Sequence, residues 1–334
     1  MRAIVTGADG FIGCALTELL ASEWGPQSVQ AVVGPVQHEK EGRRLERLKR
    51  LGTPLISSDL RQSPVFHDEL ADFDVLFHLA AYARTEINSH DVRINDLGTE
   101  RLLTELRPRL AGKRFIYTST LAAVDRPPGG GRMTSETPCR PRTEYGATKL
   151  AAEQMVKAAA LEVGFDYTIL RLSTVYGPGY RPGGMFDLLA KLLARNALST
   201  RIQWPGKLAL LEVDDLARIL VQTSTHPDMS NRTFFVSSDE DPTMGEISGR
   251  IAQSIGARYR PIVLPPWFLR WLGAVRSPIW QNAAMPHWIK ILAWRTSLLL
   301  DGLYCDGSEL TNLLQTKYQP WRQAFERMYA ESPD

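Results

Sequence analysis

A glycine-rich turn near the amino terminus constrains the fold of this chain more than any other feature. Residues 6–13, TGADGFIG, follow the apolar run at 3–5 and precede a helical pattern of apolar residues. Gly7 permits backbone angles closed to other residues, Gly10 lets the main chain approach a pyrophosphate, and Gly13 lets the helix pack closely on the strand. The N–H groups and the positive dipole end of the helix then face the phosphates. The turn predicts a nucleotide-binding strand, turn and helix, with a tight turn that holds no ligand as the alternative.

Short apolar runs and helical patterns alternate along the chain after this unit. Strands are expected at residues 29–33, 55–57, 75–79 and 114–118, and helices at residues 41–51, 95–106 and 145–162. Repeated strand and helix predict an α/β fold, a Rossmann-type doubly wound parallel sheet. Strands of such a sheet are buried on both faces, so continuous apolar runs are expected in place of alternation. Ligands bind beyond the carboxyl ends of the strands.

The length of 334 residues exceeds one minimal domain and allows a substantial core. We expect a dinucleotide-binding Rossmann domain at residues 1–173, to which residues 207–238 return. A smaller, mainly helical substrate-binding lobe is expected at residues 174–206 and 239–334.

Charge and cysteine content argue against several classes of protein. A formal net charge of +2 does not indicate a nucleic-acid-binding protein. The basic residues at 40–50 alternate with Glu, as is typical of a solvent-exposed helix. The three cysteines Cys14, Cys139 and Cys305 show no metal-ligand spacing, so no metal site is predicted. With no export-signal pattern at the start, we expect a cytoplasmic, reduced protein.

Residues 261–304 are rich in Trp and Leu, but Arg, Lys and Pro interrupt every apolar run. None approaches the roughly 20 residues that a membrane-spanning helix needs. Core packing, a dimer surface or a lid is the expected role of the aromatic residues, and a lipophilic pocket or peripheral membrane contact is a lesser alternative. The aromatic residues concerned are Trp267, Trp271, Trp280, Trp288 and Trp294.

Tyr145 and Lys149 stand four residues apart in a helical pattern. That spacing puts a phenol and an ammonium on one helix face, where the cation favours the phenolate and suits it to proton transfer. The strand that ends in Thr118-Ser119-Thr120 supplies a hydroxyl for the same substrate oxygen. A purely structural role is the alternative for the pair taken alone.

Together these residues resemble the extended short-chain dehydrogenase/reductase superfamily, that is, the NAD-dependent epimerase/dehydratase family. The resemblance covers most of the chain. Further matching segments follow in order at residues 58–60, 78–81, 95–99, 171–179 and 213–217. Within them, structural roles are expected for His78, Asn95 and Asp215.

The resemblance implies that Tyr145 is the general acid/base and that Lys149 holds the nicotinamide ribose and promotes ionisation of the phenol. It also implies that Thr120 orients the substrate oxygen, with Ser119 as the fallback. Hydride then passes between the nicotinamide carbon and a substrate carbinol carbon, while the protein supplies orientation and electrostatics. The other implied cofactor contacts are Gly7, Gly10, Phe11, Ile12, Gly13, Asp59, Leu60, Leu79, Ala80 and Ala81.

Three positions depart from the family pattern for cofactor and substrate. Gly34 stands where members that use NAD carry an acid for the ribose hydroxyls, so the cofactor is NAD or NADP, with NADP slightly favoured. Lys40, Arg43 or Arg44 could reach its 2′-phosphate, although a role on a solvated helix face is the favoured interpretation of each of them alone. Leu208 stands where an Arg often binds the substrate diphosphate, which removes a bidentate partner. The substrate-binding candidates are therefore Thr174, which replaces a family Asn, together with Arg181, Arg201 and Lys207.

Three functions follow from this pattern. The favoured one is an NAD(P)-dependent nucleotide-sugar 4-epimerase or 4-ketoreductase; a dehydratase is disfavoured because Leu121-Ala122, not an Asp-Glu pair, follow Thr120. The second is a reductase or dehydrogenase of a lipophilic alcohol or ketone, similar to hydroxysteroid and dihydroflavonol reductases. The third is a non-catalytic cofactor-binding regulatory protein.

A homodimer is expected through the helices at residues 95–106 and 145–162. The exact substrate and the redox direction stay open.

Overall fold

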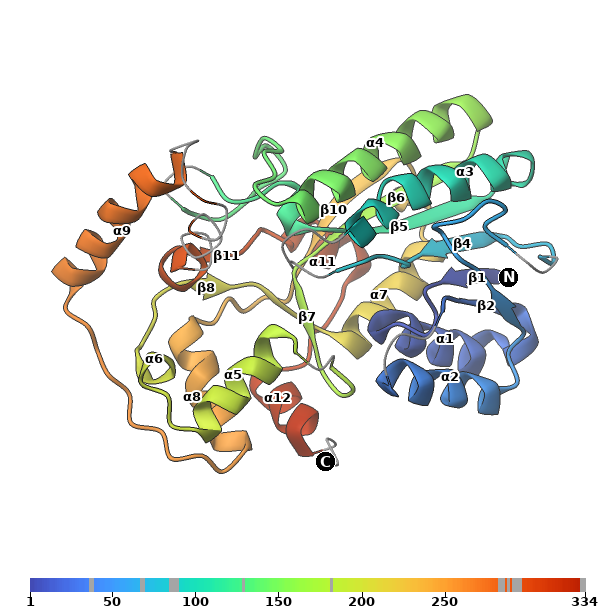
Figure 1. The fold of residues 1–334 in the computed structure, drawn as a ribbon. Coiled ribbons are helices and arrows are strands. Elements are labelled where there is room, and N and C mark those ends of the chain that lie inside the picture. Colours follow the sequence, from blue (N-terminus) through green and yellow to red (C-terminus); the bar gives the residue numbers. More distant parts are fainter. Residues whose placement is uncertain are drawn as a thin grey trace.

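A seven-stranded parallel sheet forms the centre of the larger lobe (Figure 1). The computed structural model describes residues 1–35, 39–66, 70–83, 90–127, 130–180, 183–281, 286, 289 and 296–330. The strand order is β10-β6-β5-β4-β1-β2-β3. The strands are β1 (Ala3–Thr6), β2 (Val29–Val33), β3 (Leu55–Ser57), β4 (Val75–His78), β5 (Arg114–Thr120), β6 (Asp166–Leu172) and β10 (Arg232–Val236). The predicted doubly wound sheet is confirmed.

Burial on both faces explains why these strands carry continuous apolar runs. Every residue of β1 and of β4 is buried. Alternate residues of β1 serve different faces: Val5 packs with Leu16 and Leu20, whereas Ile4 packs with residues such as Leu102. The sheet therefore separates two hydrophobic cores.

Helices cover each face of the sheet (Figure 1). On one face lie α1 (Phe11–Trp24), α2 (Glu39–Leu51) and α7 (Val213–Thr225), and on the other lie α3 (Leu97–Leu110) and α4 (Glu144–Val163). Short 3-10 helices connect them: η1 (Pro26–Ser28), η2 (His90–Ile94), η3 (Leu121–Ala123) and η4 (Pro227–Met229).

Helix α3 differs from its predicted bounds at both ends. It begins at Leu97 because Asp96 is its N-cap, with a side chain that accepts from the Leu97 N–H. It continues through Pro108 to Leu110, although the proline supplies no backbone N–H to the last turn.

The second lobe combines two short strand pairs with several helices. Strand β7 (Thr174–Tyr176) pairs with β9 (Leu210–Glu212), and β8 (Lys207–Leu208) pairs with β11 (Gly302–Leu303). The helices are α5 (Met185–Ala194), α6 (Leu198–Arg201), α8 (Met244–Ser254), α9 (Pro266–Gln281) and α12 (Trp321–Ala330). In contrast, α11 (Ser308–Leu314) packs against β10 and α7 of the larger lobe. An aromatic cluster of Tyr176, Phe186 and Phe325 centres this lobe, with 4.6 Å between the Tyr176 and Phe325 ring centroids. Because β10 pairs with β6, the chain returns to the main sheet before α8.

Candidate functional site

The glycine-rich turn joins β1 to α1 at the carboxyl edge of the sheet. Gly7 has a φ of +71°, and a Cβ there would lie 2.8 Å from the Ala80 backbone. A Cβ on Gly13 would lie 2.0 Å from the Gly7 carbonyl oxygen. Helix α1 has Gly10 as its N-cap and no side-chain cap, so its first N–H groups are available to an anion. The turn therefore fits the pyrophosphate of a dinucleotide.

The loop after β4 lies beside this turn, and the loop after β3 follows at the same edge of the sheet; together they hold the other expected cofactor contacts. The Ala80 N–H donates to Thr6 Oγ1 at 3.3 Å, and the Leu79 N–H donates to the Thr6 carbonyl at 3.3 Å. Asp59 is buried and accepts from Arg61 Nε at 2.9 Å. Leu60 packs against the helix at Gly98. Each loop is thus fixed by its own contacts, before any contact with a ligand.

His78 supports the floor of this region from inside the sheet. It is fully buried, with Nδ1 2.8 Å from Thr6 Oγ1 and Nε2 2.9 Å from Thr99 Oγ1. The Thr99 hydroxyl donates to the Asn95 carbonyl, so it accepts from the Nε2–H of the ring. Burial lowers the pKa of His78 to about 3, which keeps the ring neutral. The expected structural role of His78 agrees with these contacts.

Asn95 connects the cofactor loop to the helix that carries the expected catalytic pair. Its Oδ1 accepts from the Tyr82 N–H at 2.8 Å, and its Nδ2 donates to the Tyr82 carbonyl at 3.1 Å. The same Nδ2 lies 3.3 Å from Thr148 Oγ1 on α4. Asn95 is therefore a positioning residue, as its expected structural role implies.

A close contact between α4 and η3 determines the relation of Tyr145 to Thr120. Thr120 ends β5, is partly buried, and accepts from the Ala122 N–H at 3.2 Å. Tyr145 lies in the first turn of α4 and is also partly exposed. Between them, a Cβ on Gly146 would lie 2.1 Å from the Ala122 carbonyl oxygen. Only glycine at 146 lets α4 approach η3 this closely, and this brings the first turn of α4, which carries Tyr145, close to the end of β5.

The fallback residue Ser119 faces the other side of the strand. It is buried, and its hydroxyl donates to Glu153 Oε1 at 2.5 Å. Because that hydroxyl is already used, the geometry favours Thr120 as the residue that would orient a substrate oxygen.

Lys149 is buried against Tyr117 on β5. Only 2% of Lys149 is exposed, and burial lowers the pKa of its ammonium to about 7, opposed by the negative charge of Glu153 one helical turn later. Glu153 is fully buried and accepts from Arg171 Nη2 at 2.7 Å and from Arg171 Nε at 3.0 Å. The catalytic candidate therefore belongs to a buried charge network.

Sequence reasoning missed Glu153 and Tyr117. A signal for Glu153 was present, since an acid four residues after Lys149 falls on the same helix face. Tyr117 had no such signal, because it reads as one more apolar residue of a buried strand.

The expected substrate residues lie on separate elements. The Thr174 N–H at the start of β7 donates to the Ala209 carbonyl at 3.1 Å, and Arg201 Nε at the end of α6 donates to the Arg260 carbonyl at 2.9 Å. Lys207 on β8 is exposed, and its ammonium lies 5.9 Å from the Tyr304 ring centroid. Arg181 lies outside the described residues.

An acid of the glycine-rich turn lies beside the end of β2, a proximity that sequence reasoning missed. Gly34 is exposed, and its N–H lies 3.5 Å from Asp9 Oδ1. Arg44 is buried and donates to the Gly179 carbonyl at 2.9 Å, while Arg43 is exposed. The side chain of Lys40 lies outside the described residues. Of the three expected cations, Arg44 thus connects α2 to the second lobe.

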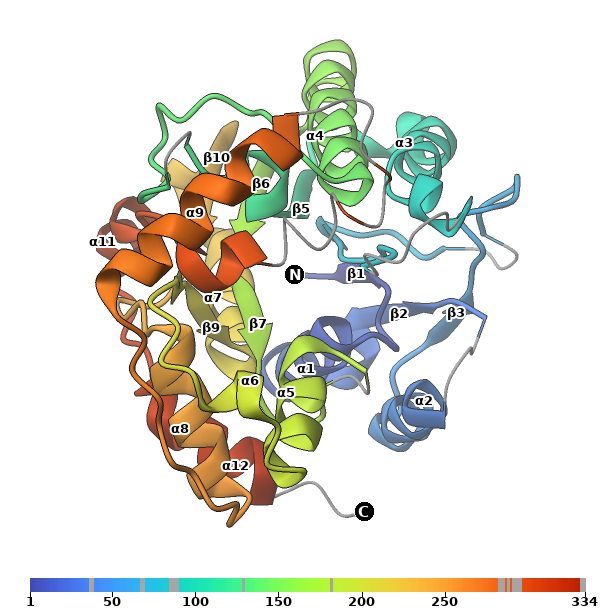
Figure 2. The ribbon, with the colours of Figure 1, turned by 60° about the vertical axis from the view of Figure 1, so that its left-hand side comes forward.

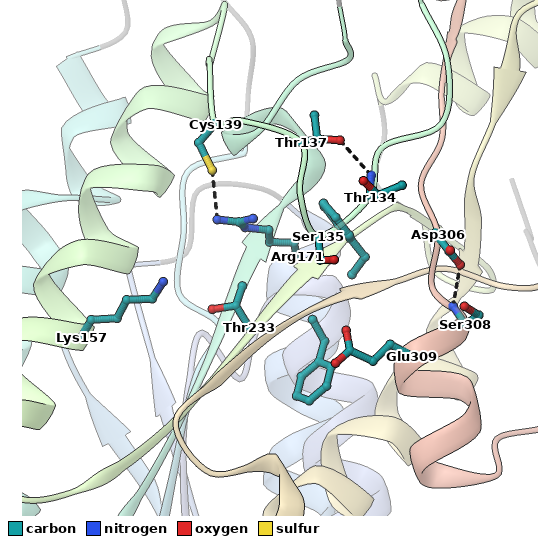
Figure 3. A pocket seen from close by; sticks show the side chains of 12 residues that line it. Thr134, Ser135, Thr137, Cys139, Lys157, Arg171, Thr233, Asp306, Ser308 and Glu309 are labelled. Carbon is teal, nitrogen blue, oxygen red and sulfur yellow. Dashed lines mark hydrogen bonds between the residues drawn. The ribbon is translucent and has the colours of Figure 1, made fainter.

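A hollow of about 340 Å³ is lined in part by Arg171, the ion-pair partner of Glu153 (Figure 3). Arg171 and Lys157 point into it, and Cys139 Sγ lies 3.2 Å from Arg171 Nη2. Its lining contains none of Thr120, Tyr145 and Lys149, so it is separate from the candidate site. In the described part of the chain, no group of three His, Cys, Asp or Glu residues is arranged to hold a metal ion.

Comparison with known proteins decides the family. The model of the NAD dependent epimerase/dehydratase family matches residues 3–236. The chain belongs to this family. The match includes the glycine-rich turn, Thr120, Tyr145 and Lys149, and it confirms the resemblance inferred from the sequence motifs.

Known proteins with different activities resemble this chain. UDP-glucose 4-epimerase of Mycolicibacterium smegmatis is 27% identical over 315 residues, 90% of this chain and 95% of that protein. The 2-alkyl-3-oxoalkanoate reductase of Stenotrophomonas maltophilia is 28% identical over 271 residues, 77% of this chain and 76% of that protein. The solved structure of UDP-glucuronic acid 4-epimerase from Bacillus cereus in complex with NAD has a TM-score of 0.77 at 20% identity, over 99% of this chain and 96% of that one.

Proposed function

We propose that this chain is an NAD(P)-dependent nucleotide-sugar 4-epimerase or 4-ketoreductase. The observation that carries the proposal is that three elements meet the same edge of the parallel sheet: the end of β5 with Thr120, the start of α4 with Tyr145 and Lys149, and the uncapped, glycine-lined start of α1. The sugar-nucleotide class is supported by the related UDP-glucose 4-epimerase, which is similar over nearly the whole chain.

In the proposed reaction, Tyr145, Thr120 and Lys149 have separate roles. Bound NAD(P) supplies the hydride acceptor or donor. The Tyr145 phenolate accepts the proton of the substrate hydroxyl as its carbon is oxidised, and the phenol returns the proton in the reverse direction. Thr120 donates a hydrogen bond to the same oxygen. Lys149 keeps a positive charge near the phenolate and holds the nicotinamide ribose.

The cofactor preference is a separate part of the proposal. NAD suits the family, whose description names it. NADP stays an expectation that rests on Gly34, where a Cβ would meet nothing within 4 Å and a 2′-phosphate has room. The Asp9 carboxylate beside Gly34 opposes it, because it would repel that phosphate.

A second candidate is a reductase of a lipophilic ketone. Leu208 is 4% exposed and offers no charge to a diphosphate. The related 2-alkyl-3-oxoalkanoate reductase adds support from outside the sugar enzymes. The intact Thr120, Tyr145 and Lys149 argue against the non-catalytic alternative.

A homodimer through α3 and α4 is also proposed. These helices pack side by side, and an ion pair between Arg107 and Glu162 joins them within one chain. Leu161 on α4 is 91% exposed, as suits a position that a partner would cover. Light scattering at micromolar concentration tests this, and a monomer would contradict it.

Product analysis tests the reaction. The purified protein is incubated with UDP- or dTDP-sugars and either cofactor, and the sugar configuration is followed by NMR while nicotinamide absorbance is recorded. An epimerase inverts C4 without net cofactor turnover, whereas a ketoreductase oxidises one NAD(P)H for each alcohol formed. Reduction of a 3-oxoalkanoate, with every nucleotide sugar left unchanged, would replace the sugar proposal by the lipophilic one.

A further inference from the structure

The region from residue 247 to residue 300 has an unusual charge composition. It contains seven Lys or Arg residues and no Asp or Glu. The whole chain has 39 Lys and Arg against 37 Asp and Glu, so this region carries +7 and the remainder −5. It also holds five of the eight tryptophans. Positive charge and aromatic side chains are thus concentrated in the same part of the second lobe.

Part of this region is exposed on one helix and the segment before it. Among the apolar residues, Val263 is 80% exposed, Trp267 69% and Trp271 55%. The cations of the same stretch, Arg258, Arg260 and Arg270, are also exposed. We call these six residues the basic aromatic face. Figure 1 shows α9 at the opposite end of the molecule from α2, and Figure 2 brings this side forward.

The aromatic side chains of this face form an ordered row. Trp267 and Trp271 are four residues apart on α9 and therefore lie on one side of the helix. Phe268 contacts both, with ring centroids 5.8 Å from Trp267 and 5.6 Å from Trp271. Two indoles held side by side in water form an exposed apolar patch of the kind that marks an interaction site.

We propose that the basic aromatic face binds the surface of an anionic lipid bilayer. Tryptophan is enriched at the headgroup level of membranes, because its ring is largely apolar and its N–H stays hydrated. Arginine beside it is attracted to anionic lipid phosphates. The described part of the chain contains no helix with both the length and the apolarity needed to cross a membrane.

A second copy of the chain fits this face less well than a bilayer does. A symmetric dimer would place the same patch against itself and bring the arginines of two copies together. With no acid among residues 247–300, nothing in this region would neutralise them. An anionic bilayer offers a headgroup region for the indoles and phosphates for the arginines at the same surface. The proposal does not depend on which reaction the site performs.

Vesicle flotation with the full-length protein tests this proposal. Vesicles of phosphatidylcholine and phosphatidylglycerol should carry the protein, and vesicles of phosphatidylcholine alone should carry far less. High salt should weaken the attachment, because it screens the arginines. The fluorescence of tryptophan should shift to shorter wavelength when anionic vesicles are added.

Variants then locate the surface. The Trp267→Ala/Trp271→Ala double variant should bind anionic vesicles at least about 10-fold more weakly. Arg258→Gln/Arg270→Gln should lose roughly 10- to 30-fold. Leu188→Ala, which trims a 51% exposed leucine on α5, is the matched control and should bind normally.

Two outcomes would overturn the proposal. One is that anionic vesicles do not retain the parent protein, or retain the tryptophan variant equally well. The other is that the protein is a dimer in solution that the tryptophan double variant converts to monomer, which would assign the face to a second copy. Unchanged melting temperatures and activity of the variants would show that neither result comes from misfolding.

Discussion

The ammonium nitrogen of Lys149 lies 4.1 Å from the centroid of the Tyr117 ring. Tyr117 is fully buried, so this cation–π contact forms in a desolvated setting where such contacts are strongest. Burial alone would favour neutral Lys149, whereas the ring face and the Glu153 carboxylate favour the charged form. The charge of Lys149 near neutral pH thus depends on two fully buried side chains, Tyr117 and Glu153.

Replacing Glu153 by Gln should lower both the free energy of unfolding and the fraction of Lys149 that is charged near neutral pH. Arg171 would lose its buried partner, so the free energy of unfolding should fall by about 3 to 5 kcal/mol. The pKa of Lys149 should decrease further, so activity that needs charged Lys149 should disappear at a lower pH as the pH is raised. Urea unfolding and the pH dependence of turnover measure the two effects.

Glu162→Gln is the matched control for this change. Glu162 lies on the same helix in an ion pair with Arg107, but the two side chains are 61% and 52% exposed. Its replacement should lower the free energy of unfolding by under about 1 kcal/mol and leave the pH dependence of turnover unchanged. Equal effects of the two variants would show that Glu153 has no special relation to Lys149.

Replacing Tyr145 by Phe should separate chemistry from binding. The phenol is the proposed proton carrier, so turnover should fall by roughly 100- to 10,000-fold. Cofactor affinity and melting temperature should change little, because the ring remains. Lys149→Ala, in contrast, should impair both affinity and turnover. Steady-state kinetics with cofactor titration measures this, and near-normal turnover of the Phe variant would remove Tyr145 from the mechanism.

Replacing Gly34 by Asp should change cofactor choice without steric cost. The position is exposed, and an added Cβ meets nothing within 4 Å. A second carboxylate beside Asp9 should weaken NADPH binding much more than NADH binding, since it would face the 2′-phosphate. Gly34→Asn controls for size without charge. A parent protein that already binds NADH far more tightly in fluorescence titration would contradict the NADP preference.

His78 should make stability depend on pH. Its pKa is about 3 in the folded protein and 6.5 as a free side chain, so only the unfolded chain takes up a proton between these values. Its contribution is complete above pH 6.5 and is lost as the pH falls toward 3, by up to about 1.4 kcal/mol per pH unit. His78→Gln, which cannot titrate, should lose less stability over this window in urea unfolding.

Glu212 makes the free energy of unfolding change with pH in the opposite direction and would mask part of the His78 effect. Its burial raises the pKa of the carboxyl to about 7 from 4.5, so its contribution is complete below pH 4.5 and is lost as the pH rises through 7. The His78 effect is therefore clearest when both proteins carry Glu212→Gln, whose amide oxygen can still cap α7. Parallel pH curves for the two proteins would show that His78 is not protonated on unfolding.

The sheet and its nucleotide turn were predictable from sequence because their signals are local. The glycines at 7, 10 and 13 and the apolar run of β4 each specify their own conformation. The network around Glu153 was not predictable, since Ser119 and Arg171 are 34 and 18 residues away along the chain and meet only when β5, β6 and α4 pack. The same reason hid the approach of Asp9 to Gly34.

The contact of Gly146 with the Ala122 carbonyl leaves no room for even one methyl group. A chain with alanine there would retain every chemical group of the candidate site and still displace α4 from η3. We therefore expect activity to be sensitive to the addition of a methyl group that takes no part in the reaction. Substitution experiments confined to the polar side chains of the candidate site would not detect this requirement, which comes from the close approach of two backbone segments.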